Sequence, residues 1–96
     1  MKFYLYYLGL EDGSDEAREL VAVEDAADES EMEDVLMEAV RMDILGRQEY
    51  AGHKAYAFAP EQEPNGIYSI MGAAAPNAGG ANTILYYEAE KEKTDL

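Results

Sequence analysis

Ninety-six residues with a formal net charge of −14 make one small domain with a strongly acidic surface. The apolar fraction of 48% excludes a disordered acidic tail, and the absence of cysteine excludes disulfides, a thiolate nucleophile and cysteine-bound metals. The charge argues against unaided binding to nucleic acid or anionic membranes, because both repel it. Nothing approaches the ~20 apolar residues of a membrane-spanning helix, so we expect a soluble, cytoplasmic protein.

The first two predicted elements are strands joined by a turn. Residues 2–8 carry aromatic and branched side chains on both faces, which is typical of a central strand covered on both sides. Residues 11–15 are turn formers, and residues 19–23 are apolar again. We therefore expect the segments 2–8 and 19–23 to pair as a β-hairpin.

A helix is predicted after the second strand. Ser30 and Glu33 have the spacing of a capping box, and a competing start lies at Asp25, with Asp28 three residues further on. Gly46 suits the position that follows the end of a helix. Between these limits, apolar side chains recur with helical spacing at Met32, Val35, Leu36, Ala39 and Val40.

The second half of the chain is predicted to be mainly β-structure. Turn-rich connections separate three further apolar segments that we expect to be strands: 54–59, 67–71 and 83–88. Residues 72–82 are expected to form a loop of small residues, and 89–96 a frayed, charged tail. We predict a single domain, residues 1–96, of the α+β class, in the order β-β-α-β-β-β. It has a mostly antiparallel sheet of four to five strands, with one acidic helix on one face.

Few side chains offer catalytic chemistry. His53 could carry a proton, but it lies on a Gly-His-Lys link, where a solvent-facing histidine is the simpler interpretation. The acidic cluster at 12–16 lacks the residue order of a calcium loop, and residues 72–80 lack the lysine of a phosphate-binding loop. We therefore predict no catalytic residue, metal or cofactor. A metal-dependent hydrolase using carboxylates is the enzymatic alternative.

Tyrosine is prominent, and its place in the fold bears on function. We expect most tyrosines to shield the core of the sheet, because strands favour amphipathic aromatic side chains. The alternative is a contact surface, since tyrosine offers a large area at low entropic cost. The eight are Tyr4, Tyr6, Tyr7, Tyr50, Tyr56, Tyr68, Tyr86 and Tyr87.

The acidity is concentrated in one segment. Residues 11–49 hold 15 of the 21 carboxylates and three arginines, which gives this segment a net charge of −12. On the predicted helix, Glu31, Asp34 and Glu38 share a face, and carboxylates with this spacing lie about 5–6 Å apart. Adjacent phosphates of a DNA strand have a comparable separation. We predict that a basic partner is bound by Glu24, Asp25, Asp28, Glu29, Glu31, Asp34 and Glu38.

The stretch Leu20-Val21-Ala22-Val23-Glu24-Asp25-Ala26-Ala27-Asp28-Glu29 places a strand directly before an acidic helix. With the small size and the lack of cysteine, this layout resembles small acidic inhibitors from phages and mobile elements, including anti-CRISPR and anti-restriction proteins. Several of those proteins mimic DNA. The resemblance, which concerns layout and charge, covers about half of the chain. It implies a non-enzymatic inhibitor, in the cytoplasm of a bacterial host, that occupies a positively charged channel of a nuclease or CRISPR-type effector.

Two other interpretations stay open. In the first, the chain is an interaction module or antitoxin-like partner that docks through its tyrosine-rich sheet, and the acidity serves solubility. In the second, the acidic face is only solvated. A homodimer formed through the sheet is compatible with either binding mode.

Overall fold

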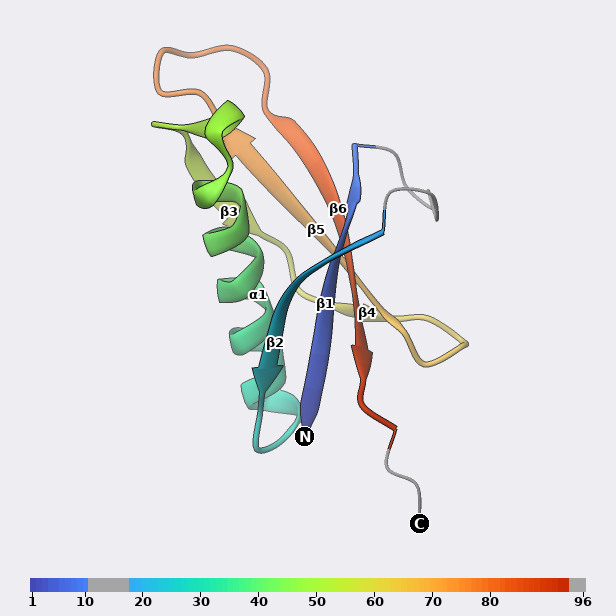
Figure 1. Ribbon diagram of the computed structural model, residues 1–96. Coiled ribbons are helices and arrows are strands. Elements are labelled where there is room, and N and C mark those ends of the chain that lie inside the picture. The colour runs from blue at the N-terminus through green and yellow to red at the C-terminus, as the bar shows by residue number, and fades with distance from the viewer. Residues whose placement is uncertain (11–17, 94–96) are drawn as a thin grey trace.

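One antiparallel sheet and one α-helix make up the part of the chain that the computed structural model describes, residues 1–10 and 18–93 (Figure 1). The elements follow in the order β1 (Lys2–Gly9), β2 (Glu19–Asp25), α1 (Glu29–Gly46), the 3-10 helix η2 (Gln48–Tyr50), β3 (Lys54–Ala57), β4 (Glu61–Gln62), β5 (Tyr68–Ala75) and β6 (Thr83–Lys91). The α+β class and the predicted order are confirmed. The described strands number six rather than four to five, because the short β4 also joins the sheet.

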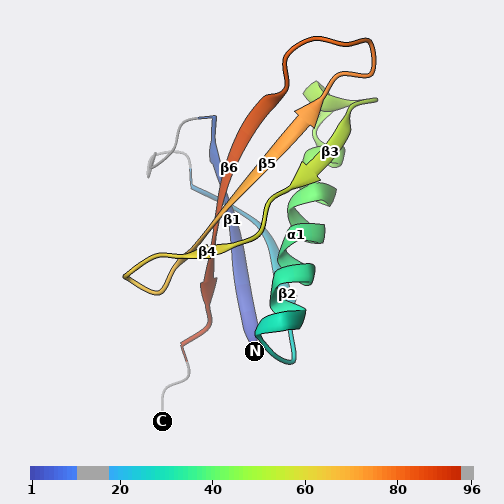
Figure 2. The same ribbon diagram turned by 180° about the vertical axis from the view of Figure 1, so that it is seen from behind.

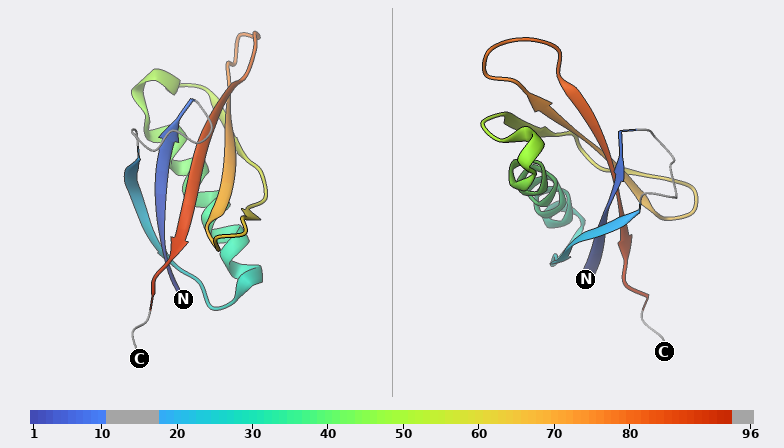
Figure 3. Two further views of the ribbon diagram at one scale, coloured as in Figure 1. Left: turned by 90° about the vertical axis from the view of Figure 1, so that its right-hand side faces the viewer. Right: turned by 45° about the horizontal axis from the view of Figure 1, so that its top comes forward.

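The sheet is curled around the helix. Its strand order is β2-β1-β6-β5-β3, with β4 beside β5, and every pairing is antiparallel. The predicted pairing of β1 with β2 is confirmed, whereas the predicted turn between them falls in 11–17, outside the described residues. The curl brings both edge strands, β2 and β3, against α1 (Figure 3). The helix therefore fills the concave side of the sheet.

In the part of the chain that the structure describes, α1 covers one face of the sheet and no second layer covers the other, as the view from behind also shows (Figure 2). On the covered face, Phe3 and Leu5 of β1 are buried, while Tyr4 and Tyr6 on the opposite face are half-buried. On that opposite face Leu8 is buried as well, so the predicted covering of β1 on both sides is confirmed in part: complete on the helix side, and incomplete at the two tyrosines. The aromatic rings of the open face have apolar bodies and polar tips, so they tolerate partial exposure without a second layer.

The core lies between α1 and the sheet, and its closest approach is at Gly72 of β5. A Cβ atom built at Gly72 would lie 2.7 Å from Ile44 Cδ1 and 3.0 Å from Val40 Cγ1, both on α1. Ala74 of the same strand is fully buried. The small residues at 72–75 are part of β5 and not of the predicted loop, because they pair with β3. At Gly72 the helix packs so close that a larger side chain would collide with it.

The ends of α1 differ from the predicted ones. Asp28 is the N-cap: its backbone is extended, and its Oδ1 accepts a hydrogen bond from the Glu31 N–H at 2.8 Å. The predicted starts at Ser30 and Asp25 are therefore wrong, since Ser30 lies inside the first turn and Asp25 ends β2. Gly46 is the last helical residue and not the one that follows. A cap must combine extended backbone with a free acceptor, and Asp28 meets both conditions.

The last strand is longer than predicted. β6 continues to Lys91, and Ala89, expected in the frayed tail, is fully buried and pairs with Leu5. The remainder of that predicted tail includes 94–96, which lie outside the described residues. Pairing with β1 on one side orders this charged segment, because its backbone groups find partners along an internal strand.

Candidate functional site

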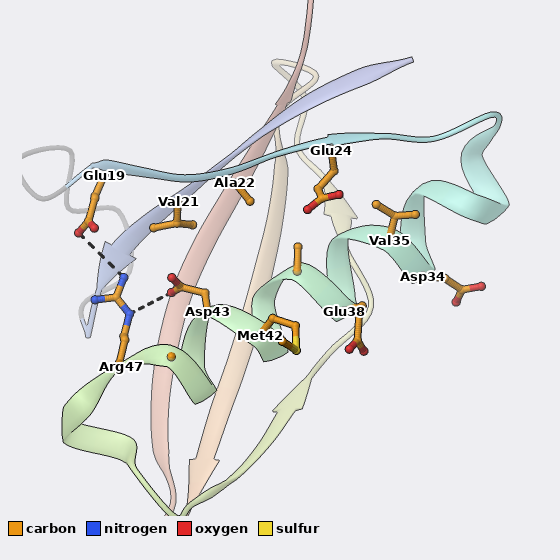
Figure 4. A pocket seen from close by; sticks show the side chains of 12 residues that line it. Glu19, Val21, Ala22, Glu24, Asp34, Val35, Glu38, Met42, Asp43 and Arg47 are labelled. Atoms are coloured by element: carbon orange, nitrogen blue, oxygen red, sulfur yellow. Dashed lines mark hydrogen bonds and ion pairs between the residues drawn. The ribbon is translucent and has the colours of Figure 1, made fainter.

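A groove runs between β2 and α1 and is the candidate binding site (Figure 4). Its volume is about 800 Å³. Strand and helix each form one wall, with an apolar floor and charged residues along the edges. The lining residues are Glu19, Val21, Ala22, Glu24, Asp34, Val35, Glu38, Ala39, Met42, Asp43, Gly46 and Arg47.

The strand wall contains a bulge that turns extra side chains toward the groove. Leu5 of β1 pairs with Ala22 and Tyr6 with Leu20, so Val21 has no partner across the ladder. Side chains normally alternate between the faces of a strand, but Val21 and Ala22 both line the groove and are half-buried (Figure 4). The bulge thus gives β2 a short apolar surface opposite α1.

The helix wall combines an apolar floor with an acidic rim. Ala39 is buried and Val35 half-buried, while Met42 keeps 58% of its surface exposed. Asp34 and Glu38 form the rim on the solvent side. Such exposure of a methionine beside carboxylates leaves apolar area that a bound chain could cover.

Three of the seven predicted partner-binding residues come together at the groove: Glu24 from β2, and Asp34 and Glu38 from α1. The other four do not line it. Asp28, Glu29 and Glu31 gather at the N-terminal end of α1, where the helix dipole favours negative charge, and Asp25 is exposed at the end of β2. Asp28 in addition has the structural role of N-cap.

The charge of Glu38 is partly compensated. Its Oε2 forms an ion pair with Arg41 one turn later on the helix. Arg41 also donates from Nε to the Ala55 carbonyl oxygen on β3 at 3.2 Å, which ties α1 to the far edge of the sheet. Among the described residues, no ion pair involves Glu24 or Asp34. The strongest uncompensated charge of the rim therefore comes from these two.

A polar network closes one end of the groove. The Tyr87 hydroxyl donates to Asp43 Oδ2 at 2.6 Å, and Arg47 Nε donates to the same oxygen at 2.9 Å. The Arg47 guanidinium lies over the Tyr7 ring, 3.7 Å from its centroid, and reaches Glu19 at 3.9 Å. This network joins the end of α1 to β1, β2 and β6, so it fixes the width of the groove at this end.

The network was not predicted from the sequence. Asp43 and Arg47 lie four residues apart, the spacing of a helical ion pair, and that signal could have been noticed. The contribution of Tyr87, 44 residues away along the chain, has no local signature.

The electrostatics of this network favour a structural role. Burial, and then the hydrogen bond to Asp43, raise the pKa of Tyr87 far above its usual value, although the charge of Arg47 acts in the opposite direction. Burial acts to lower the pKa of Arg47, but the contacts with Asp43 raise it above its usual value overall. Both groups thus keep their protons at neutral pH and act as fixed donors. Neither is poised for proton transfer.

The histidine and the carboxylate clusters that were considered for catalysis or metal binding do not form a site among the described residues. His53 is half-buried, its ring stands edge-on to Tyr50 with 5.7 Å between the ring centroids, and it does not line the groove between β2 and α1. Within 1–10 and 18–93, no group of three or more histidine or carboxylate side chains is arranged to hold a metal ion. The acidic cluster at 12–16 lies outside these residues. Among the described helices, none has the length and apolar character needed to cross a membrane.

The open face of the sheet is chemically different from the groove. Cross-strand pairing places Tyr56, Ala73 and Ile84 in one row and Met71 beside Tyr86 in the next. The backbone N–H of Phe58 donates a hydrogen bond to the Met71 carbonyl oxygen, which places Phe58 beside these two rows. Together the six residues form an apolar patch, in which the side chains of four are exposed: Tyr56, Phe58, Met71 and Ile84. We call this the open-face patch.

Two carboxylates of β6 on the open face share one arginine. Arg18 pairs with Glu88 at 2.7 Å and with Glu90 at 2.8 Å. Its guanidinium also lies 3.7 Å from the centroid of the Tyr6 ring. Arg18 belongs to the acidic segment of the sequence, yet its charge offsets carboxylates of β6. The acidic segment is therefore even less compensated in space than along the chain.

Comparison with known proteins identified no relative: no protein-family model, no curated protein and no solved structure matched the chain. Function is therefore inferred from the charge and geometry of the surfaces described above.

Proposed function

We propose that this protein is a non-enzymatic inhibitor that binds a basic, nucleic-acid-handling protein through the acidic surface of α1 and β2. We define this acidic face by Glu24, Glu31, Asp34 and Glu38. The observation that carries the proposal is the concentration of carboxylates on these two adjoining elements, with few described cations beside them. A surface of this kind attracts a positively charged protein at long range and repels nucleic acid.

The three arginines of the acidic segment support this proposal by their positions. Arg18 pairs with carboxylates of β6 on the open face, and Arg47 is held by Asp43 at the closed end of the groove. Arg41 alone compensates a member of the acidic face, Glu38. Solubility alone does not require the arginines to pair with carboxylates away from the acidic face. A face that competes with nucleic acid for a cationic channel does require carboxylates that no arginine neutralises.

Binding of this kind has a kinetic consequence. Complementary charge accelerates diffusional encounter, and the gain falls as salt screens the charges over about 8–10 Å at physiological ionic strength. We therefore expect fast association that slows with added salt, and competition between this protein and DNA for the same basic surface.

The test compares two variants of equal charge. Glu31→Gln with Asp34→Asn and Glu38→Gln removes three of the four charges of the acidic face. Glu61→Gln with Glu63→Gln and Glu92→Gln removes three exposed carboxylates elsewhere, so both variants have a net charge of −11. Each is immobilised and exposed to a nuclease-treated bacterial lysate at low and high salt, and the captured proteins are identified.

We expect the wild type and the second variant to capture a basic nucleic-acid-handling enzyme, displaceable by DNA, and the first variant to lose it by at least about tenfold, equivalent to ~1.4 kcal/mol. Equal capture by both variants would contradict a role for the acidic face. The captured enzyme is then assayed with added protein, because inhibition of its activity distinguishes an inhibitor from a passive ligand.

The open-face patch favours a second candidate, docking of a protein partner or a second copy through the sheet. Tyr86 is half-buried there, but Tyr87 is 1% exposed and cannot contribute to such a contact. Replacing Tyr56 and Met71 by serine removes exposed apolar area from this patch and leaves the acidic face intact. If this variant loses the captured enzyme, or loses self-association measured by sedimentation, the patch is the binding surface.

A further inference from the structure

The groove between β2 and α1 has an unpaired strand edge as one wall. Among residues 1–10 and 18–93, β2 is the terminal strand of the sheet and pairs with β1 alone. Alternate residues of an edge strand direct their N–H and C=O groups away from the sheet, where they can pair with another extended chain. Along Glu19–Asp25 the strand extends about 3.3 Å per residue, enough to pair with a segment of five to seven residues.

We propose that the groove binds an extended protein segment in which basic and apolar side chains alternate, and that this segment pairs with the free edge of β2. This inference rests on the proposed function and specifies the kind of partner segment that the acidic surface recognises. It adds a backbone-pairing mode to what the acidity alone would provide.

The alternation follows from the two sides of the groove. In an added strand, every second side chain points toward the floor, which consists of Val21, Ala22, Val35, Ala39 and Met42. The intervening side chains point outward, where Glu24 of β2 borders the groove on one side and Asp34 and Glu38 of α1 border it on the other. Small apolar residues suit the first set of positions, and lysine or arginine the second.

Charge also decides which chains are rejected. Edge strands are commonly protected from self-association by charged side chains and by bulges, and β2 has both. A second copy of this acidic chain would bring carboxylates against Glu19, Glu24 and Asp25, which disfavours pairing between copies. A basic segment meets no such repulsion. The same residues therefore exclude self-addition and select a cationic partner.

The fixed end of the groove supports a preformed site. Arg47 lines the groove, but Asp43 and the Tyr7 ring already hold it in place, and it is in turn beside Glu19. Its charge is thus offset and does not oppose a cationic segment. Because the network joins α1 to three strands, the spacing of the groove walls at this end exists before binding, which reduces the ordering cost of association.

The probe is a capped heptapeptide in which lysine alternates with valine, used with two backbone-methylated forms. Alternate N–H groups point to the same edge of a strand, so methylating the valine nitrogens blocks one edge and methylating the lysine nitrogens blocks the other. All three peptides have the same charge. Binding is followed by NMR titration of the ¹⁵N-labelled protein, together with amide hydrogen exchange of β2.

We expect the parent peptide and one methylated form to bind and to slow exchange in β2, and the other form to bind at least tenfold more weakly. If both methylated forms bind as the parent does and β2 exchange is unchanged, strand pairing is overturned. The salt-sensitive attraction of the acidic face would then still stand, so the two proposals fail separately.

A matched pair of variants tests the groove itself. Met42→Arg places a long cationic side chain in the groove, and Leu45→Arg makes the same change three residues later on α1, at an exposed position that does not line it. Each raises the net charge by one, so long-range attraction changes equally. We expect Met42→Arg to weaken binding of the parent peptide at least tenfold and Leu45→Arg less than threefold. Equal weakening by the two variants would contradict binding in the groove.

Discussion

The packing of α1 on β5 makes Gly72 the most size-sensitive position that the structure identifies. A Cβ at this position would lie 2.7 Å from Ile44 Cδ1, about 1 Å closer than the 3.5–4.0 Å at which carbon atoms attract each other best. Ile44 is fully buried, so its methyl group has little room to move. Alanine would ordinarily stabilise a strand by ~0.5–1 kcal/mol relative to glycine. Overpacking costs ~1–3 kcal/mol, so we expect Gly72→Ala to lower the free energy of unfolding by about 1–2 kcal/mol.

A double-mutant cycle identifies the clash. Ile44→Val removes Cδ1, the nearest atom, and alone costs ~0.5–1.5 kcal/mol. With that atom absent, the closest contact of the alanine Cβ is Val40 Cγ1 at 3.0 Å, which a small shift of the side chain relieves, so the double variant should be no less stable than Ile44→Val by more than about 0.5 kcal/mol. The resulting coupling is about 1 kcal/mol, above the usual scatter of independent sites.

Urea unfolding followed by far-UV circular dichroism at constant salt measures all four proteins. Gly46→Ala serves as the matched control: it has no atom within 4 Å of the new Cβ, and as a helical position it should gain up to about 1 kcal/mol. A Gly72→Ala variant as stable as the wild type would refute the close-packing argument, as would effects of Gly72→Ala and Ile44→Val that simply add.

Two further predictions concern the helix cap and the polar network. In urea unfolding, Asp28→Ala should destabilise the protein by ~0.5–2 kcal/mol, and Ser30→Ala by much less. A larger effect of Ser30→Ala would indicate that Ser30, and not Asp28, caps the helix. Tyr87→Phe should cost ~1.5–3 kcal/mol, because the hydroxyl donates to the charged Asp43. Since the pKa of Tyr87 is raised in the folded state, the unfolded chain loses this proton first, and stability falls as pH rises above about 10, by up to ~1.4 kcal/mol per pH unit. Unfolding midpoints between pH 9 and 11.5 should therefore fall less steeply for Tyr87→Phe, and parallel slopes would contradict the raised pKa.

Local patterns in the sequence were sufficient to predict the helix and the main strands. The apolar spacing from Met32 to Val40 predicts a helix, and that stripe is the buried face of α1 except for Val35, which lines the groove. The strands were found because their branched and aromatic residues favour extended backbone. The concentration of carboxylates on β2 and α1 was likewise readable, because these elements are adjacent along the chain and need only a short connection to lie side by side.

The tertiary structure decided what each of those elements contacts. The stretch at 72–75 reads as a loop from its small residues, but in the structure it pairs with β3 as a strand, and the approach of Val40 and Ile44 explains why residue 72 is a glycine. In the same way, Ala89 appeared to belong to a charged tail until pairing with Leu5 of β1 placed it in the core. The size of each side chain can be read from the sequence, but the distant residues that pack against it cannot.

Some properties of the candidate site could likewise be predicted from the sequence, and others depend on the tertiary structure. The acidic character of Glu24, Asp34 and Glu38 is a property of the sequence, because charge is local and additive. The groove they border depends on the bulge at Val21, on the curl that brings β2 to α1, and on the bond between Tyr87 and Asp43. These features join residues of different elements, up to 44 positions apart along the chain, so no pattern within a single element encodes them. They exist only once the sheet has closed around the helix.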